Sequence, residues 1–301
     1  MNLLLRVLKY IFDADCRFRV NASQGLYKSM DDKMFLQRYY KARTGRELEL
    51  DNPKTFNEKL QWLKLHDRNP YYSELVDKAR VKTIVASIIG EQHIIPTYGV
   101  WERFDDINFD SLPDQFVLKC THDSHSVFIC KDKKTFDMKT ARNKINRALN
   151  KNYYLQSREW PYKNVKPRVL AEKYMVDESG VELKDYKVLC FNGEPKLIEL
   201  HQGRFADKHY QDFYDLNWKK TTICNIHEEL HPEVFPKPVC LEEMLEFSQM
   251  LSKDIPHVRV DWYIINEKLY FGELTFYDAS GFDLFKDDKD DLMLGSWITV
   301  I

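Results

Sequence analysis

Residues 258–276 read VRVDWYIINEKLYFGELTF, two apolar runs joined by a short polar turn. Side chains alternate between the two faces of a strand, so Arg259 and Asp261 share one face of the first run. The same alternation places Glu273 and Thr275 together on one face of the second run. The stretch therefore predicts a β-hairpin with one charged face.

The register of this hairpin depends on the length of its turn. If residues 266–268 form a three-residue turn, Asp261 lies opposite Glu273, whereas a two-residue turn would move the two carboxylates apart. Opposed side chains in antiparallel strands have Cβ atoms about 4.5–5.5 Å apart, where like charges repel. A divalent cation would relieve this repulsion, since Mg²⁺ takes one or two carboxylates together with water and phosphate. Neutralisation by Arg259 alone is the alternative.

The composition is that of a globular chain with balanced charge. Among 301 residues, 45 Lys and Arg face 47 Asp and Glu, so the net charge of -2 gives no support for nucleic-acid binding. The six cysteines form no CxxC pair and no signal peptide precedes them, which predicts a reducing, cytoplasmic location. The sequence contains no run of 18 apolar residues, so we expect no membrane-spanning helix.

The residue pattern changes along the chain from helical to strand-like, so we expect an α+β fold. Residues 1–75 are expected to form a helical segment and residues 76–301 a second, strand-rich region, because the pattern changes near residue 75. Helices are expected to start at Asp31 or Asp32 and after Asn52, and to cover Ser73–Ile89 and Leu241–Ser252. Strands are expected at residues 94–96, 116–119, 127–130, 169–172, 186–191 and 196–200, with the Asn192-Gly193 turn between the last two.

The opening residues 1–19 combine Leu, Ile, Val and Phe with Arg6, Lys9, Arg17 and Arg19. A segment of this kind is able to lie on an anionic membrane surface, at the inner face of the membrane. An ordinary packed helix is the alternative, since so short a segment binds membranes weakly.

Two strand-borne lysines and a polar loop suggest a phosphate site. Lys119 ends an apolar strand, and the loop that follows it, residues 120–126, contains only small or polar residues, Ser124 and Ser126 among them. Anions are bound where charge and hydrogen-bond donors converge from fixed elements, so this strand and loop are a candidate phosphate clamp. Lys187 lies on a later strand, and each lysine has an alternative reading as a surface charge.

The order of these short patterns resembles the ATP-grasp superfamily, most closely its TupA-like branch, which is linked to bacterial surface polysaccharide and teichuronopeptide synthesis. The resemblance runs over residues 52–295. It is carried by Asp77-Lys78, Phe116-Val-Leu-Lys119, Ala171-Glu-Lys-Tyr-Met175, Arg259-Val-Asp261 and Glu273-Leu-Thr275, together with Thr55-Phe-Asn-Glu-Lys-Leu-Gln-Trp62, Tyr98-Gly-Val-Trp101, Leu112-Pro113, Asp185-Tyr-Lys187 and Asn192-Gly-Glu-Pro195.

The resemblance implies an ATP-grasp fold, with two α+β lobes that clasp ATP, and a set of site residues. By this resemblance, the ATP phosphates would meet Lys78, Lys119, Ser124 and Ser126, the adenine would meet Glu172, Lys173 and Met175, and the ribose Asp185. Asp261, Glu273 and Thr275 would hold Mg²⁺, while Arg259, Lys187 and Arg204 would act on the transferred phosphoryl group.

The activity that the resemblance implies is a Mg²⁺-ATP-dependent carboxylate–amine ligase that forms an acyl phosphate. Its partners would be ATP, a carboxylate-bearing sugar or glycan such as a uronic acid, and an amine donor such as an amino acid. A glycan kinase, a glycosyltransferase and a non-catalytic nucleotide-binding scaffold are the alternatives. The sequence departs from the family pattern at Thr275, where Asn is common, and at Asp123 and His125, where glycine is common.

Two further motifs compete with this interpretation. His227-Glu-Glu-Leu-His231 matches the zinc pattern HExxH, but Pro232, which follows directly, opposes the long helix that such a site needs. Asp288-Lys-Asp290 is similar to the metal motif of glycosyltransferases, yet residues 287–291 are more simply a solvated turn.

Overall fold

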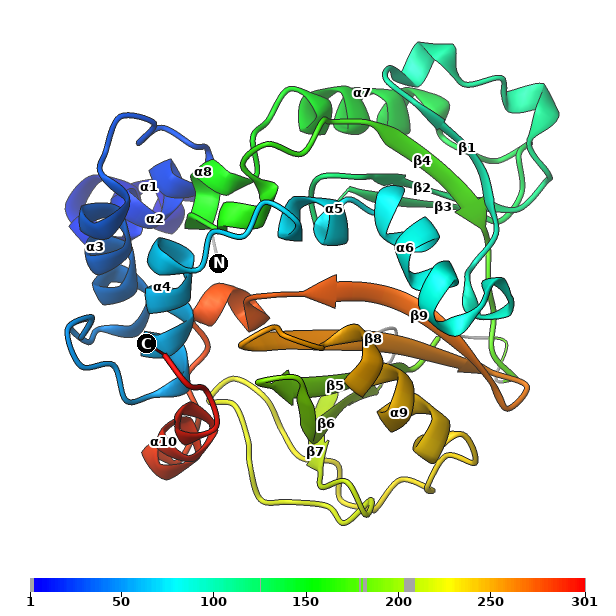
Figure 1. Ribbon diagram of the computed structural model, residues 1–301. Coiled ribbons are helices and arrows are strands. Elements are labelled where there is room, and N and C mark those ends of the chain that lie inside the picture. The colour runs from blue at the N-terminus through cyan, green and yellow to red at the C-terminus, as the bar shows by residue number, and fades with distance from the viewer. Residues whose placement is uncertain (1–2, 125, 179, 181–182, 203–208, 301) are drawn as a thin grey trace.

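The computed structural model describes residues 3–124, 126–178, 180, 183–202 and 209–300. Two antiparallel sheets, stacked one above the other in Figure 1, dominate the fold. The strand order is β1-β4-β2-β3 in the smaller sheet and β7-β6-β5-β8-β9 in the larger one. Every strand pair within these sheets is antiparallel, so the observed architecture is α+β, as predicted.

The smaller sheet forms the upper lobe in Figure 1, with α7 (Met138–Leu149) on its outer side. Leu118 and Ala171 from the sheet and Ile145 from α7 are fully buried in one apolar cluster. Its strands are β1 (Thr97–Trp101), β2 (Phe116–Cys120), β3 (Val127–Cys130) and β4 (Val169–Lys173). The strand expected at residues 94–96 was wrong: β1 begins after Pro96, and Ile94 makes only an isolated bridge to Phe271.

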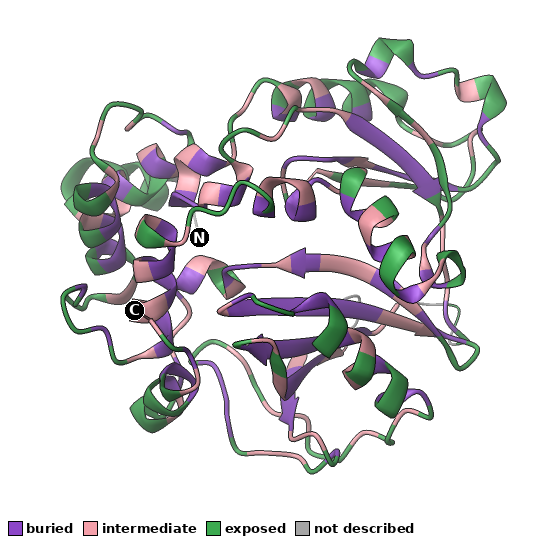
Figure 2. Ribbon diagram, viewed as in Figure 1, coloured by how far each residue is buried: buried purple, intermediate pink, exposed green. Residues whose placement is uncertain are grey.

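The larger sheet forms the lower lobe and holds the main core. Val188, Val260 and Trp262 are fully buried there, and the central strands β5 and β8 are largely coloured as buried in Figure 2. The strands are β5 (Asp185–Phe191), β6 (Glu194–Gln202), β7 (Tyr210–Tyr214), β8 (His257–Ile265) and β9 (Lys268–Thr275). Helix α9 (Leu241–Leu251) packs against β5, β6 and β8, as the apolar spacing predicts.

The first helices follow their capping residues. Asp31 caps α3 (Asp32–Thr44), and Thr55 with Glu58 forms a capping box at the start of α4 (Phe56–His66). Phe56 and Leu60 of α4 belong to the core of the larger sheet. The boundary at residue 75 stays a prediction.

The single helix expected over Ser73–Ile89 was wrong. Asp77 interrupts it with an extended ψ of 108°, leaving α5 (Tyr72–Val76) and α6 (Arg80–Ile89). The Asp77 carboxylate accepts hydrogen bonds from the backbone N–H groups of Ala79 and Arg80, and it pairs with Arg168 at 2.7 Å. These contacts satisfy the free donors of a new helix start, so the chain turns here.

Helix α1 (Leu3–Phe12) leaves its apolar residues outside the core. Phe12 is 82% exposed and Leu4 63% exposed, while Arg17 of α2 (Ala14–Ser23) donates to the backbone oxygen of Ile11. An ordinary packed helix would bury these side chains. Among the described residues, no helix has both the length and the apolar character needed to cross a membrane.

The remaining helices are short. Alpha-helix α8 (Tyr154–Ser157) packs against α2, and α10 (Asp288–Ser296) packs against α4. Residues 287–291 are not the solvated turn we expected, because Asp287 caps α10 and Asp291 is buried. The Asp291 carboxylate accepts from the backbone and side-chain nitrogens of Asn57, which ties the end of the chain to α4.

Candidate functional site

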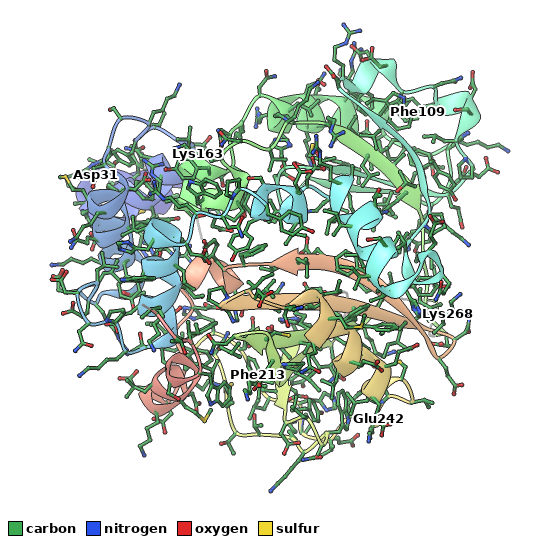
Figure 3. The ribbon with its side chains drawn as sticks, viewed as in Figure 1. Asp31, Phe109, Lys163, Phe213, Glu242 and Lys268 are labelled. Atoms are coloured by element: carbon green, nitrogen blue, oxygen red, sulfur yellow. The ribbon has the colours of Figure 1, made fainter. Side chains whose placement is uncertain are left out.

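The β8–β9 hairpin brings Asp261 opposite Glu273, but not by the turn that we expected. Its turn has two residues, Asn266 and Glu267, both with positive φ, so Ile265 pairs with Lys268. Positive φ at both positions is typical of a type I′ turn, which matches the twist of the strands. Figure 3 shows Lys268 at the outer end of this hairpin.

A β-bulge at Gly272 then restores the register. Trp262 pairs with Phe271 whereas Asp261 pairs with Glu273, so Gly272 is the extra residue. A Cβ atom at Gly272 would lie 2.9 Å from the carbonyl oxygen of Asp261, closer than an ordinary contact. Glycine permits this approach of the two backbones. The predicted three-residue turn was wrong. The predicted opposition of Asp261 and Glu273 is right, because the bulge compensates for the shorter turn.

The charged face continues across the larger sheet. Lys187 on β5 pairs with Asp261 on one side and with Glu199 of β6 on the other. A row of Glu199, Lys187, Asp261 and Glu273 therefore crosses four strands, and Lys187, Glu199 and Asp261 are all buried. Such a row is stable only if further cations or donors compensate its carboxylates.

Arg259 supplies one of these cations. Its guanidinium contacts both carboxylate oxygens of Asp261 at 2.7 Å, pairs with Asp278, and lies 3.3 Å from the hydroxyl of Thr275. Burial raises the pKa of Asp261 to about 6, although Arg259 opposes this shift. Asp261 is thus ionised at neutral pH, as a Mg²⁺ ligand must be. In this conformation Arg259 neutralises Asp261, the alternative that the sequence left open.

Lys78 reaches the same face from a helical segment that packs on β9 of the larger sheet. It lies between α5 and α6, and its Nζ is 3.2 Å from Glu273 and 2.7 Å from the backbone oxygen of Asp123. Burial raises the pKa of Glu273, but Lys78, Arg259 and Lys119 outweigh it and hold that pKa below its usual range. The lysine therefore links the carboxylate pair to the polar loop after β2.

Lys119 and Glu172 form a second buried pair on the smaller sheet. Lys119 on β2 contacts Glu172 on β4, and Lys82 of α6 contacts the other oxygen of the same carboxylate at 2.8 Å. Burial raises the pKa of Glu172, but the two lysines lower it to about 2. The sequence analysis did not point to Lys82, which lies in α6 four residues after Lys78.

The loop after β2 is tied by its own side chains. The hydroxyl of Ser124 lies 2.7 Å from that of Tyr153, and Ser126 donates to the carboxylate of Asp123. The two hydroxyls of the predicted phosphate clamp therefore already have partners in this conformation. His125, which stands where glycine is common in the family, lies outside the described residues.

The other predicted site residues lie along the strands that follow. Lys173 is exposed at the end of β4 and Met175 is half-buried beyond it, whereas Asp185 is buried at the start of β5. Arg204, the third residue predicted to act on the phosphoryl group, lies outside the described residues. The structure thus collects Lys78, Lys119, Lys187, Arg259 and four carboxylates around facing parts of both lobes.

The competing motifs do not form sites of their own. Residues 227–231 are not helical, so the two histidines of the HExxH pattern do not share a helical face. In the described part of the chain, no group of three or more His, Cys, Asp or Glu side chains is arranged to hold a metal ion alone. Asp288-Lys-Asp290 lies in the first turn of α10.

Sequence reasoning also missed Glu199 and Asp278. Both are carboxylates beside Arg259, with Glu199 Oε2 at 3.9 Å from a guanidinium nitrogen. Asp278 begins the 3-10 helix η5 (Asp278–Gly281) directly after β9. Side chains alternate between the two faces of β6, so Glu199 would have been predicted beside Lys187 if the pairing of β6 with β5 had been known.

Comparison with models of protein families gives a match that spans most of the chain. A family model described as TupA-like ATPgrasp matches residues 58–299, which confirms the predicted fold class and agrees with the predicted enzyme class, an ATP-grasp ligase. No curated protein matches the chain.

Two solved structures illustrate the structural likeness. D-alanine-D-alanine ligase from Helicobacter pylori has a TM-score of 0.42 and 16% identity, covering 81% of this chain and 69% of that one. D-alanine–D-alanine ligase from Bacillus anthracis, complexed with ATP, has a TM-score of 0.42 and 13% identity, covering 88% and 82%. At these scores the likeness carries no information on the site.

Proposed function

The chain belongs to the TupA-like ATP-grasp family, and on this premise we propose that it is a Mg²⁺-ATP-dependent carboxylate–amine ligase. The observation that carries the proposal is the opposition of Asp261 and Glu273, two carboxylates surrounded by Lys78, Lys187 and Arg259. Phosphoryl transfer depends mainly on positioning and charge neutralisation, which this arrangement is built to provide.

The residues present fit a magnesium ion. Asp261 and Glu273 would hold it with Thr275, and two carboxylates with a neutral oxygen suit an ion that takes its other ligands from water and phosphate. When bound, Mg²⁺ neutralises charge on the phosphate oxygens. Arg259 would release part of its contact with Asp261 and turn to the transferred phosphoryl group, and Lys187 would meet that group from β5.

The nucleotide would lie between the two lobes. Lys119 and the loop of Ser124 and Ser126 would contact the phosphates from the smaller sheet, and Lys78 would contact them from between α5 and α6. We assign the adenine to Glu172, Lys173 and Met175 and the ribose to Asp185, as the family resemblance implies. Arg204 keeps its proposed phosphoryl role on the same ground.

The substrates follow from the reaction class. A carboxylate oxygen attacks the γ-phosphate to form an acyl phosphate with loss of ADP, and an amine then displaces phosphate to form an amide. The carboxylate would belong to a uronic acid of a surface glycan and the amine to an amino acid, which places the enzyme in bacterial surface polysaccharide synthesis.

The exposed apolar face of α1 supports a further partner. Leu4, Ile11 and Phe12 lie outside the core, with Arg6 and Lys9 on the same helix. Apolar side chains next to cations favour the surface of an anionic bilayer. We therefore infer that α1 holds the cytoplasmic enzyme at the inner face of the membrane, near a membrane-bound glycan.

The test is product analysis with uronic acids, amino acids and Mg²⁺-ATP. We expect ADP release that requires both substrates and an amide product by mass spectrometry. The double variant Asp261→Asn, Glu273→Gln should lose turnover, and the matched control Glu242→Gln, Glu243→Gln on the exposed face of α9 should keep it. Full turnover by the first variant, ADP release without an amine, or binding of UDP-sugars in place of ATP would each refute the proposal.

A further inference from the structure

A pocket with a basic wall lies between the loop after β2 and the last turns of α7. Gln24 at the end of α2 and Gln156 of α8 complete its wall. Its volume is about 250 Å³, whereas pockets that enclose a whole drug-sized ligand have roughly 300–1,000 Å³. This basic pocket therefore fits one small group of a ligand, and a complete nucleotide would not fit in it.

Three cations line the basic pocket. Lys144 and Arg147 lie on α7 and Lys151 follows its end, at spacings of three and four residues that place them on one side. None of the three pairs with a carboxylate that the structure describes, whereas Arg142 on the same helix pairs with Asp105 at 2.6 Å. Cations that converge on a pocket without a protein partner favour an anionic ligand.

The rest of the wall suits a ligand that also carries hydroxyl groups. The carboxylate of Asp123 lines the pocket and accepts from the backbone N–H and the hydroxyl of Ser126. A bare phosphate ion would be repelled by this carboxylate, but a sugar hydroxyl donates to it. The amides of Gln24 and Gln156 offer both donors and acceptors. Cations beside a carboxylate and two amides therefore fit an acidic sugar better than a simple anion.

The wall contains one polar atom that lacks a partner. The ring of His122 is 2% exposed and forms part of the wall, and its Nε2 donates to the backbone oxygen of Ala148. Its Nδ1 has no hydrogen-bond partner in the part of the chain that the structure describes. Buried polar atoms are usually paired, so a ligand or a water molecule is needed to complete this wall.

The basic pocket and the candidate ATP site share the loop after β2. The side chain of Asp123 lines the pocket, while its backbone oxygen accepts from Lys78 at 2.7 Å. Nζ of Lys78 is in turn 3.2 Å from Glu273. A single ammonium group therefore separates the pocket wall from the carboxylate pair, and a chain-like ligand is able to occupy the pocket with one unit and the site with the next.

We propose that the basic pocket binds one acidic sugar unit next to the unit that reacts, so that the acceptor is an acidic oligosaccharide and not a single sugar. The inference deepens the proposed ligase function and rests on it. Arg147 would bind the carboxylate of this unit, because its planar guanidinium matches two carboxylate oxygens, with Lys144 and Lys151 adding charge. Asp123 and the two amides would bind its hydroxyls.

The pocket is tested on the protein alone by calorimetric titration with tetragalacturonate. We expect binding that weakens with added salt, and at least about tenfold weaker binding by Arg147→Gln. The matched control Arg142→Gln removes the same charge from the same helix outside the pocket and should bind as the wild type does. Failure of the wild type to bind, or equal binding by Arg147→Gln, overturns the inference. Displacement of tetragalacturonate by an equal concentration of inorganic phosphate or of Mg²⁺-ATP overturns it too.

Turnover separates this inference from the ligase proposal. With Mg²⁺-ATP and amino acids, we expect the KM for tetragalacturonate to be at least about tenfold below that for galacturonate, and Arg147→Gln should remove this difference. Equal KM values in the wild type overturn the inference and leave the ligase proposal standing. A wild type that binds tetragalacturonate in the pocket but forms no amide with either acceptor refutes the ligase proposal instead.

Discussion

Replacing Gly272 with alanine tests whether the bulge in β9 sets the carboxylate pair. The new Cβ would lie 2.9 Å from the carbonyl oxygen of Asp261, and ordinary contacts begin at 3.4 Å. The two strands must therefore move apart by about 0.5 Å at this point. Backbone contacts of this kind cannot be relieved by a side-chain rotation, so the shift passes to Asp261 and Glu273.

This displacement gives two expected magnitudes. Overpacking in a buried site costs about 1–3 kcal/mol, so the Tm should fall by about 2–4 °C for each kcal/mol. A misplacement of about 1 Å in an active site costs about 10²-fold in rate, so half of that displacement should lower kcat about tenfold and raise the Mg²⁺ concentration needed for half-maximal turnover.

The assays are thermal unfolding and ATP turnover against Mg²⁺ concentration, with Gly99→Ala as the matched control. Gly99 directly follows the bulge at Tyr98, between β1 and β4, and the three atoms nearest to a Cβ there all belong to the Trp101 side chain. The control should lose stability without changing the Mg²⁺ dependence. If Gly272→Ala also keeps the wild-type Mg²⁺ dependence, the bulge does not position a metal pair.

Three more outcomes follow from the structure. The variant Lys119→Met leaves the buried Glu172 carboxylate with Lys82 alone. We therefore expect the free energy of unfolding, measured with denaturant, to fall by up to about 3–5 kcal/mol. The double variant with Glu172→Gln should recover that free energy. Burial lowers the pKa of His257 to about 3 in the folded protein. The unfolded chain binds a proton at this histidine near pH 6.5, so the free energy of unfolding falls as the pH drops below 6.5, by at most about 1.4 kcal/mol per pH unit. The variant His257→Leu should flatten that slope. Phe12→Glu should reduce sedimentation of the protein with phosphatidylglycerol vesicles, and unchanged binding would contradict membrane contact through α1.

Much of the fold could be predicted because its signals are local. The Asn192-Gly193 turn, the helix start at Asp31 and the alternation in β8 depend on neighbouring residues, and the structure has all of them. The helix expected over Ser73–Ile89 failed for the opposite reason. Its break at Asp77 depends on Arg168, a residue far away in the sequence.

The sequence alone determined that Arg259 and Asp261 share one face, that Glu273 and Thr275 share another, and that the chain resembles an ATP-grasp protein. Period-two alternation and ordered motifs are properties of the chain itself. Only the tertiary structure decided that Asp261 meets Glu273, because the two-residue turn and the Gly272 bulge offset each other.

The partners of these charges were likewise decided by the tertiary structure. Lys82 reaches Glu172 across two lobes, and Glu199 joins His201, His209 and Glu228 only where β6 and β7 pair and a distant loop packs on them. Such contacts depend on how separate segments pack, and no local periodicity records that packing.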